Sequence, residues 1–427
     1  MNSSVLFGAF ALLMCAGVPL AVALGLAGTA VIAFAGMGMM SVPTNLYGGI
    51  AKYPLLAIPV FILAGLVFER TGVAASMVKF ASSIVGTRRG GLAVTAVLVC
   101  MLLGGISGSG PADTAAVGAI MIPAMVKAGY PKPFSASLIA AGGATDVLIP
   151  PSVAFIIYSI LVPQASVPAL FAAGIIPGIL TGLVLIAVAV FFSVRHGFGA
   201  ADKSPRPPFW RSLKEASWGL FAPVVILGGM RSGLFTPTEA AVVAVFYGLV
   251  VGMLVYRGMS WRDFWDVLAE GAEISAVIML MIGLASVFGW ATDTIGVFDA
   301  WAKSLAASGA NETFVLLSIT VVLLIAGTFL DAIATFFIFL PFLIPVAEAF
   351  QWDLVWFGVI ITLNVAIGAC TPPTAVNLMV ACRIAGIPLE STFYWTLWMV
   401  AAMTAVLLLL TFVPEISLFL PRALGYL

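Results

Sequence analysis

Charged side chains are scarce in this sequence. Of its 427 residues, 8% are charged and 62% are hydrophobic, and the mean hydropathy is +1.18. The formal net charge is zero and the sequence contains no basic run, which argues against a nucleic-acid partner. Many apolar runs exceed the roughly 18 residues that mark a transmembrane helix. The composition therefore excludes a soluble domain and predicts an all-α polytopic protein of the lipid bilayer.

Histidine and cysteine are also rare. The single histidine, His196, lies in a polar segment, and the four cysteines are scattered without a C-x-x-C pair. No nucleophile–base pair or phosphate-binding loop accompanies them, so we expect a protein that is not an enzyme. No Lys or Arg precedes Lys52. The apolar N-terminus therefore lacks the positive region of a signal peptide, and we expect retained membrane helices there.

Breaks rich in Gly, Pro and Ser interrupt several apolar runs. Between Gly104 and Pro151 the sequence has SGSGP at 107–111, and it has Asp146 followed by the Pro pair at 150–151. Backbone in hydrocarbon must satisfy its own hydrogen bonds, so broken helices persist only where protein buries them or where they line a cavity. Paired broken segments are the best indication in a sequence of a transporter's binding site.

The two halves of the chain match each other across a polar linker at 195–214. A shift of 222 residues places Gly105 on Gly327, Pro123 on Pro345 and the Pro pair at 150–151 on the pair at 372–373. Each half is predicted to contain five spans, a re-entrant helical hairpin and an amphipathic arm helix in the membrane interface. Because five is odd, the second half is inverted relative to the first, which is the inverted-repeat plan of secondary transporters.

The apolar runs give the boundaries of these elements. The first repeat, 1–194, is predicted to comprise a scaffold at 4–70 with a Gly-rich surface loop at 39–53, an arm at 72–88, a hairpin at 90–128, a broken span at 133–162 and a span at 168–194. The second repeat, 215–427, is predicted to comprise a scaffold at 215–290, an arm at 296–309, a hairpin at 313–347, a broken span at 354–382 and a span at 392–413.

The basic residues predict the orientation in the membrane. If Arg88 and Arg89 are cytoplasmic, the cytoplasmic loops and ends hold all 18 Lys and Arg residues except Lys52, Arg231, Lys303 and Arg422. The positive-inside rule favours this orientation over the inverted one. The linker is then cytoplasmic and both termini are periplasmic. The first hairpin enters from the cytoplasm and the second enters from the outside.

Three acidic residues, Asp113, Asp146 and Asp331, lie within apolar runs near the breaks. A charge at membrane depth costs at least about 2.5–3.5 kcal/mol, so each acid indicates a functional site unless it only caps a broken helix. The 222-residue shift pairs Ser109 with Asp331 and Asp113 with Thr335. Each hairpin tip thus presents two oxygen-bearing side chains four residues apart, on one face of its second half-helix.

Further oxygen-bearing side chains surround the two breaks: Thr145 and Ser152 at the first, and Asn364, Thr371, Thr374 and Asn377 at the second. Hydroxyl, carboxylate and carbonyl oxygens suit a hard cation such as Na⁺. The N–H groups at the start of a half-helix suit an anion. The pattern therefore predicts two similar cation sites flanking one anion site.

Three long motifs resemble one known family. They read GGISGSGPADTAAVGAIMIPAM from Gly104, GGATDVLIPPS from Gly142 and IGACTPPTAVNL from Ile367. They are similar to the large membrane (permease) subunit of tripartite ATP-independent periplasmic (TRAP) transporters, and the resemblance covers essentially the whole chain. It implies an elevator-type architecture, Na⁺-driven uptake of an organic acid (a carboxylate), and location in the bacterial inner membrane.

The resemblance also implies partners. These are a periplasmic substrate-binding protein and a small four-helix membrane subunit. Because the chain begins directly with spans of the large subunit, we expect the small subunit to be a separate chain. The binding protein is expected to select the acid.

The resemblance places one Na⁺ site between the first hairpin tip and the first break, and the other between the second tip and the second break. The residues predicted to hold the two Na⁺ ions are Ser107, Ser109, Gly110, Asp146, Pro150, Gly327, Asp331, Thr335, Thr371 and Pro372. The residues predicted to contact the substrate are Pro111, Asp113, Ser152, Thr374 and Asn377.

Three alternative functions fit parts of the sequence. A stand-alone divalent-anion/Na⁺ symporter would have a similar architecture but no binding protein. A channel is less favoured because two hairpins around closed sites suit alternating access. A membrane enzyme acting on lipid-linked substrates is disfavoured because no catalytic residues are found.

Overall fold

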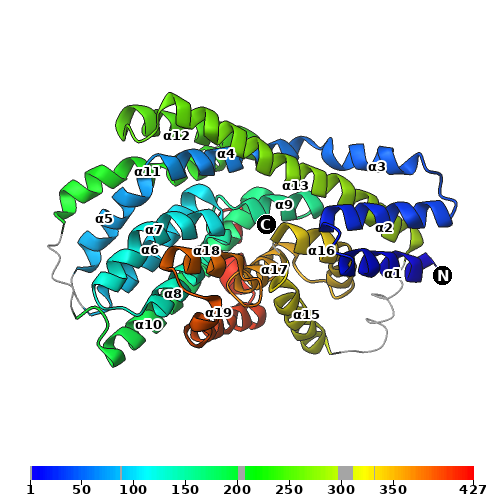
Figure 1. Ribbon diagram of the computed structural model, residues 1–427. Helices are drawn as coiled ribbons and strands as arrows, with labels where there is room; N and C mark the ends of the chain where they lie inside the picture. The colour runs from blue at the N-terminus through cyan, green and yellow to red at the C-terminus, as the bar shows by residue number, and fades with distance from the viewer. Residues whose placement is uncertain (1, 87–88, 201–206, 297–310, 331) are drawn as a thin grey trace.

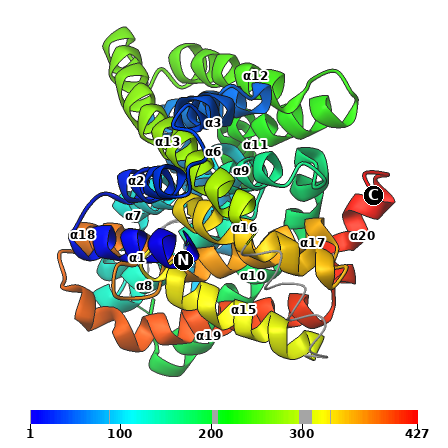
Figure 2. The ribbon, with the colours of Figure 1, turned by 90° about the vertical axis from the view of Figure 1, so that its right-hand side faces the viewer.

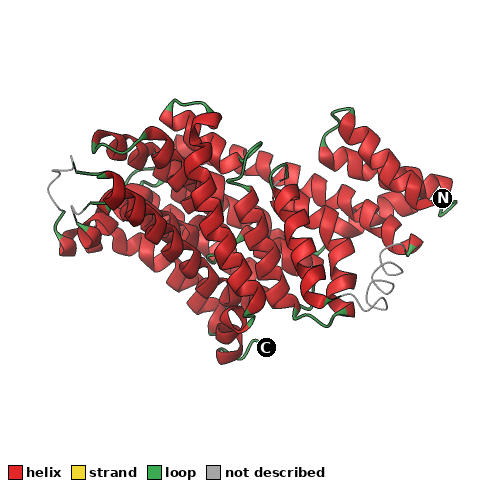
Figure 3. Cartoon of the chain, turned by 90° about the horizontal axis from the view of Figure 1, so that it is seen from below, coloured by secondary structure: helices red, strands yellow, loops and turns green. Residues whose placement is uncertain are grey.

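Helices account for all regular secondary structure in the computed structural model, which describes residues 2–86, 89–200, 207–296, 311–330 and 332–427 (Figure 3). Within these residues, six helices are long and apolar enough to cross a membrane. They are Tyr53–Arg70, Val167–His196, Pro237–Val255, Trp261–Ile295, Ala332–Ala349 and Leu389–Phe412. The prediction of an all-α chain with many apolar helices is confirmed.

One side of the molecule is a layer of packed helices along the upper edge of Figure 1, with α1 below α2 at one end (Figures 1 and 2). Its members are α1 (Asn2–Cys15), α2 (Leu20–Phe34), α3 (Ser41–Ile50), α4 (Ala57–Arg70), α11 (Phe209–Arg231), α12 (Pro237–Val250) and α13 (Trp261–Ile295). The longest, α13, begins with a capping box in which Ser260 and Asp263 bond each other's backbone N–H. It packs on α2, α3 and α4.

The prediction of a surface loop at 39–53 is wrong, because this segment contains helix α3. Its polar side chains bond back to the preceding turn: Thr44 Oγ1 donates to Met40 O at 2.8 Å and Asn45 Nδ2 donates to Ser41 O at 2.8 Å. Gly49 packs so tightly on Ser286 of α13 that a Cβ would collide with it. Glycine is a poor helix former, but here packing on α13 outweighs propensity.

The predicted linker at 195–214 is too long. Helix α10 (Val167–His196) reaches into it from one side, and α11 begins at Phe209 on the other. A short helix, α20 (Glu415–Ala423), also follows α19 (Phe393–Phe412), where no element was predicted. The boundaries were drawn from apolar runs alone, so the polar ends of α10 and α11 and the short amphipathic helix α20 were not predicted.

The remaining elements are two hairpins and two broken helices. The arm α5 (Val73–Val85) leads into the first hairpin, α6 (Gly91–Ser107) and α7 (Gly110–Lys127), and the second hairpin is α15 (Glu312–Gly327) and α16 (Ala332–Ala349). The first broken helix is α8 (Lys132–Ala144), η2 (Thr145–Val147) and α9 (Val153–Leu161). The second is α17 (Leu354–Gly368) and α18 (Val376–Ala385). Apart from Gly296, the predicted arm at 296–309 lies outside the described residues, as does Asp331.

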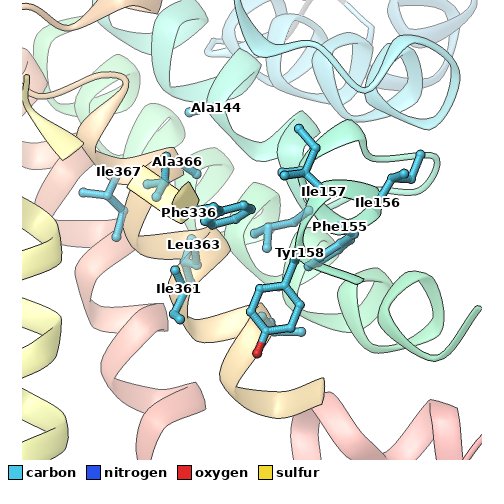
Figure 4. Packing of buried hydrophobic residues seen from close by; sticks show 14 of the residues in the cluster. Ala144, Phe155, Ile156, Ile157, Tyr158, Phe336, Ile361, Leu363, Ala366 and Ile367 are labelled. Atoms are coloured by element: carbon cyan, nitrogen blue, oxygen red, sulfur yellow. The ribbon is translucent and has the colours of Figure 1, made fainter. Parts of the chain in front are cut away.

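The second segment of each broken helix packs against the hairpin of the other half. Helix α18 packs on α7 and α8, whereas α9 packs on α16 and α17. Figure 4 shows Phe336 of α16 among side chains of α9 and α17. Its ring centroid lies 6.0 Å from that of Tyr158, whose hydroxyl donates to Leu354 O at 2.8 Å. This exchange joins the two halves through one buried core.

Candidate functional site

The tip of the first hairpin lies directly against the first helix break. A Cβ on Gly104 would lie 2.7 Å from Asp146 Oδ1 and 2.8 Å from its Cα. A Cβ on Gly108, whose φ is +63°, would collide with the carbonyl oxygen of Pro151. Glycine at these two positions therefore allows the backbone of the tip to touch the break.

Two buried carboxyl groups meet at this contact. Asp113 of α7 accepts a hydrogen bond of 2.5 Å from Ser107 Oγ and interacts electrostatically with Asp146. Asp146 is fully buried, and neither of its carboxyl oxygens has a hydrogen-bond partner among the described residues. Of the ion pairs that the described residues form, none involves either acid. Two buried acids without a basic partner are costly, and a bound cation or proton would relieve that cost.

The start of α7 meets the second broken helix. A Cβ on Gly110 would lie 3.0 Å from Asn377 Nδ2 and 2.9 Å from Gly143 O. The Asn377 amide donates to Ala140 O at 3.3 Å, and its Oδ1 is buried without a hydrogen-bond partner. The N-terminus of α7 and a free amide oxygen from the other half of the chain thus face one place.

Thr114 belongs to this region and was missed in the sequence. Its Oγ1 is buried without a hydrogen-bond partner, and it lies where a Cβ on Gly143 would collide with it. The sequence could have indicated it, because Thr114 follows Asp113 and lies four residues after Gly110. Positions four residues apart share a helix face.

The second hairpin tip lies against the second break in a similar way. Thr374 donates its backbone N–H to Thr328 O at 3.2 Å, and its hydroxyl donates to the same oxygen. A Cβ on Gly368 would collide with the backbone of Gly327. Thr335 Oγ1 and Asn364 Oδ1 are buried without hydrogen-bond partners. Asp331, predicted for this tip, is outside the described residues.

Several other predicted residues have a local bonding role. Thr371 Oγ1 donates to Ile367 O at 2.7 Å. Ser152 caps α9, accepting from Phe155 N at 3.3 Å and donating to Val147 O at 2.5 Å. Ser109 occupies the N-cap position of α7, but its side chain makes no capping hydrogen bond. Instead its N–H donates to Ser107 Oγ at 3.3 Å.

The predicted prolines lie at the same breaks. Pro111 follows Gly110 in the first turn of α7. Pro150 and Pro372 each begin a Pro-Pro pair joined by a cis peptide bond. The structure thus gathers the described candidate residues around two contacts, each between a hairpin tip and a helix break. Asp113, predicted to contact the substrate, lies beside Asp146, which was predicted to hold Na⁺.

Comparison with known proteins identifies the family. The model of the tripartite ATP-independent periplasmic transporter, DctM component, matches residues 7–416. The isethionate TRAP transporter permease protein DctMQ of Oleidesulfovibrio alaskensis is 41% identical over 421 residues, which are 97% of this chain and 66% of that protein. The C4-dicarboxylate TRAP transporter large permease protein DctM of Pseudomonas aeruginosa is 38% identical over 403 residues, 94% of each chain.

A third relative is the sialic acid TRAP transporter large permease protein SiaM of Vibrio cholerae, which is 37% identical over 383 residues and 90% of each chain. Among solved structures, the YdaH transporter of Alcanivorax borkumensis superposes with a TM-score of 0.66 at 16% identity, over 89% of this chain and 90% of that one. This likeness shows a shared fold. The chain is therefore a multi-pass membrane protein, not an enzyme, and belongs to the DctM family of TRAP transporter large permease subunits.

Proposed function

We propose that this chain carries a small organic acid across the bacterial inner membrane in symport with Na⁺. The observation that carries the proposal is the pair of buried acids, Asp113 and Asp146, without a basic partner in the described residues. The substrates named for the three relatives described above, isethionate, C4-dicarboxylate and sialic acid, are organic acids. An anionic cargo and a pair of buried acids that a cation would neutralise together favour symport.

The oxygens at the first contact fit a hard cation. Asp146 offers two unpaired carboxyl oxygens in a fully buried position, and Gly104 and Gly105 of the tip pack against Asp146 and Pro150 O respectively. Carboxylate, hydroxyl and carbonyl oxygens are the ligands that hard cations prefer. We assign Asp113, Asp146, Ser107 and the carbonyls of the tip and of Pro150 to one Na⁺ site. A bound Na⁺ neutralises charge that would otherwise face a low dielectric.

The second contact offers fewer charges. The 222-residue shift places Asp113 on Thr335 and Asp146 on Gly368, so neither acid has an acidic counterpart at the second contact. Thr335 and Asn364 each contribute an unpaired buried oxygen. We assign these two, together with Gly327, Asp331 and the segment Thr371–Pro372, to the second Na⁺ site.

The substrate is proposed to lie between the two contacts. The N-terminus of α7 at Gly110 meets Asn377 of the other half, and Thr374, three residues before Asn377, contacts the second tip at Thr328. Helix N-termini favour anions. An amide carries two N–H groups, so Asn377 can donate one to a carboxylate while the other bonds Ala140 O. Asp113 would repel an anion, so its place beside Asp146 favours a cation role over the substrate role predicted from the sequence.

An inverted repeat and an elevator motion are supported by two arrangements. In the first half, Gly104 lies close to Asp146. In the second half, Gly327 lies close to Gly368, at nearly the same positions after a shift of 222 residues. The exchange of α9 and α18 between the halves joins hairpins and broken helices, which suits movement as one body. Helix α4 of the opposite layer meets this body at the first tip, where a Cβ on Gly65 would lie 3.1 Å from Ser107 O. We propose that the layer of α1–α4 and α11–α13 stays fixed.

A periplasmic binding protein and a small membrane subunit are proposed to complete the transporter. The name of the family describes a tripartite transporter, and several relatives are named large permease proteins. Exposed Trp218, Phe221 and Phe246 on α11 and α12 give the fixed layer an apolar surface for such a subunit. Both termini are proposed to be periplasmic.

Reconstituted transport tests the proposal. Proteoliposomes holding this chain with its small subunit are given the binding protein and a radiolabelled acid such as succinate, isethionate or sialic acid. Uptake of one acid should require an inward Na⁺ gradient and the binding protein. K⁺ and proton gradients are the matched controls. Equal uptake under a proton gradient without Na⁺, or full uptake by the chain alone, would contradict the proposal.

A further inference from the structure

The short helix α20 is attached to the body of hairpins and broken helices. It packs on α10, α17 and α19, and its buried residues are Ser417, Leu418 and Pro421 (Figure 2). On its exposed side Arg422 pairs with Glu415 of the same helix at 2.7 Å. Because α17 belongs to the body proposed to move, α20 travels with that body.

The segment after α20 has a defined shape. Gly425 adopts a φ of +73°, and its N–H donates to Arg422 O at 3.0 Å. The Tyr426 N–H donates to Pro421 O at 3.0 Å. This pair of bonds is a Schellman motif, in which a left-handed glycine ends a helix. The Leu424 carbonyl, at the negative end of the helix dipole, accepts its hydrogen bond from another part of the chain.

That donor is Arg231, the last residue of α11. Its Nη1 donates to Leu424 O at 2.5 Å, and its guanidinium carbon lies 5.3 Å from the centroid of the Tyr426 ring. A cation is favourable both at the carbonyl end of a helix and over the face of an aromatic ring. Helix α11 belongs to the layer proposed to stay fixed. Both contacts of Arg231 therefore cross from the fixed layer to the moving body.

The two bodies also meet at the first hairpin tip, where small residues pack closely. A Cβ on Gly105 would lie 3.3 Å from Pro223 Cγ of α11, and a Cβ on Gly65 of α4 would lie 3.1 Å from Ser107 O. Van der Waals contacts have no preferred direction, so they can be remade as one surface slides over another. A hydrogen bond weakens steeply when its length or angle changes. The contacts of Arg231 therefore favour one position of the moving body over the others.

We infer that Arg231 and the segment Leu424–Tyr426 form a latch, which holds the moving body in the position seen in the structure. The latch must open before that body slides along the fixed layer, so it sets the lifetime of this state. The inference rests on the proposed elevator motion and deepens it by naming the contact that one end state must break. The latch lies apart from the residues assigned to Na⁺ and to the substrate.

Single-molecule fluorescence of the full chain with its small subunit tests the latch. One dye is placed on Thr44→Cys of α3 and the other on Ser391→Cys, which precedes α19, in a background without the native cysteines. Both positions are exposed, and the proposed topology places them on opposite sides of the bilayer. Sliding of the moving body therefore changes their separation. Wild-type protein should exchange between two separations, one of which matches the structure.

Arg231→Met removes the guanidinium and keeps the apolar stem. Loss of a charged hydrogen bond and a cation–π contact at an exposed site should shorten the lifetime of the structure's separation about tenfold. Tyr426→Leu removes only the ring and should shorten it about threefold. Arg231→Lys keeps a charge and a donor and should retain more of the lifetime than Arg231→Met. Arg422→Met is the control, because its ion pair stays within α20, and it should leave the lifetime unchanged.

Gly425→Ala tests the shape of the segment without altering Arg231. The added methyl group would meet no atom within 4 Å, so its effect comes from the left-handed φ alone. That strain should shorten the lifetime about fivefold. Gly197→Ala at the end of α10 is the matched control, with a φ of +72° and equally open surroundings, and it should leave the lifetime unchanged.

The outcomes separate the latch from the motion on which it rests. An unchanged lifetime in Arg231→Met, with a wild type that exchanges between two separations, overturns the latch alone. Equal shortening in Arg422→Met or in Gly197→Ala also overturns it, because loss of any charge or strain at any helix end would then suffice. A single separation in the wild type overturns the elevator motion together with the latch.

Discussion

Asn377 and Gly110 lie in contact although they belong to opposite halves of the chain. A Cβ on Gly110 would be 3.0 Å from Asn377 Nδ2, and the same amide donates to Ala140 O at 3.3 Å. The contact brings the start of α7 and the start of α18 to one point. It is the place where an anion bound at the first hairpin would also meet the second break.

Gly110→Ala should separate these two helix ends. The added methyl group would lie 2.9 Å from Gly143 O, which is backbone and cannot rotate away. We expect uptake to fall about tenfold or more, equal to at least about 1.4 kcal/mol in the rate-limiting barrier, with normal membrane insertion. Gly118→Ala on the same helix is the control, because its methyl group meets only side-chain atoms, the nearest being the flexible end of Ile384 at 3.0 Å. Equal loss in both variants would mean that the contact at Gly110 has no special role.

Asp146→Asn should remove the response of the protein to Na⁺. A ligand that binds the folded state but not the unfolded state stabilises the folded state by about 2.7 kcal/mol at a concentration 100 times its Kd. Wild-type protein should therefore melt at a higher temperature in NaCl than in KCl, and the variant should melt alike in both. Because the variant lacks one of two adjacent buried acids, it should be at least as stable as wild type in KCl.

Asp266→Asn, an exposed acid on α13, is the control for this experiment and should keep the Na⁺ effect. A full Na⁺-dependent shift in Asp146→Asn would place the cation elsewhere.

A disulfide between α4 and the first hairpin tip should stop transport. The Cβ of a residue at position 65 would lie 3.6 Å from Ser107 Cβ, within the range that a disulfide spans. Because Ser107 belongs to the proposed Na⁺ site, the comparison is between the oxidised and the reduced form of one protein. In a background without the four native cysteines, oxidised Gly65→Cys/Ser107→Cys should lose the uptake that the reduced pair retains. The two single variants show how much each substitution costs alone. Uptake that persists in the fully oxidised pair would argue against movement of the tip past α4.

Cysteine labelling tests the orientation. Ala200 and Ser232 are exposed and flank α11, whose 23 residues give a length of about 35 Å at 1.5 Å per residue. The proposed orientation places Ala200 and Ser232 on opposite sides of the bilayer. In spheroplasts, an impermeant maleimide should label Ser232→Cys and reach Ala200→Cys only after lysis. Labelling in the reverse order would invert the topology proposed from the basic residues.

The sequence predicted the helix breaks well because their causes are local. Glycine and proline at 108–111, 150–151 and 372–373 interrupt helical hydrogen bonding wherever they occur. The structure accordingly ends α6 at Ser107, starts α7 at Gly110, and separates α17 from α18 between Gly368 and Val376. Helix α3 was missed because its stability comes from packing on α13, which no property of residues 41–50 reports.

Composition and motif alone determined that this chain is a helical membrane protein and a DctM-type permease subunit. Burial of apolar runs in a bilayer and the local chemistry of Gly, Pro and Asp do not depend on which helices become neighbours. Tertiary structure alone decided that Asp113 lies beside Asp146, that Asn377 reaches Gly110, and that Thr114 is buried without a partner. These are contacts between elements distant in the chain, and they are set by the close packing of glycine-lined helix surfaces rather than by any local pattern.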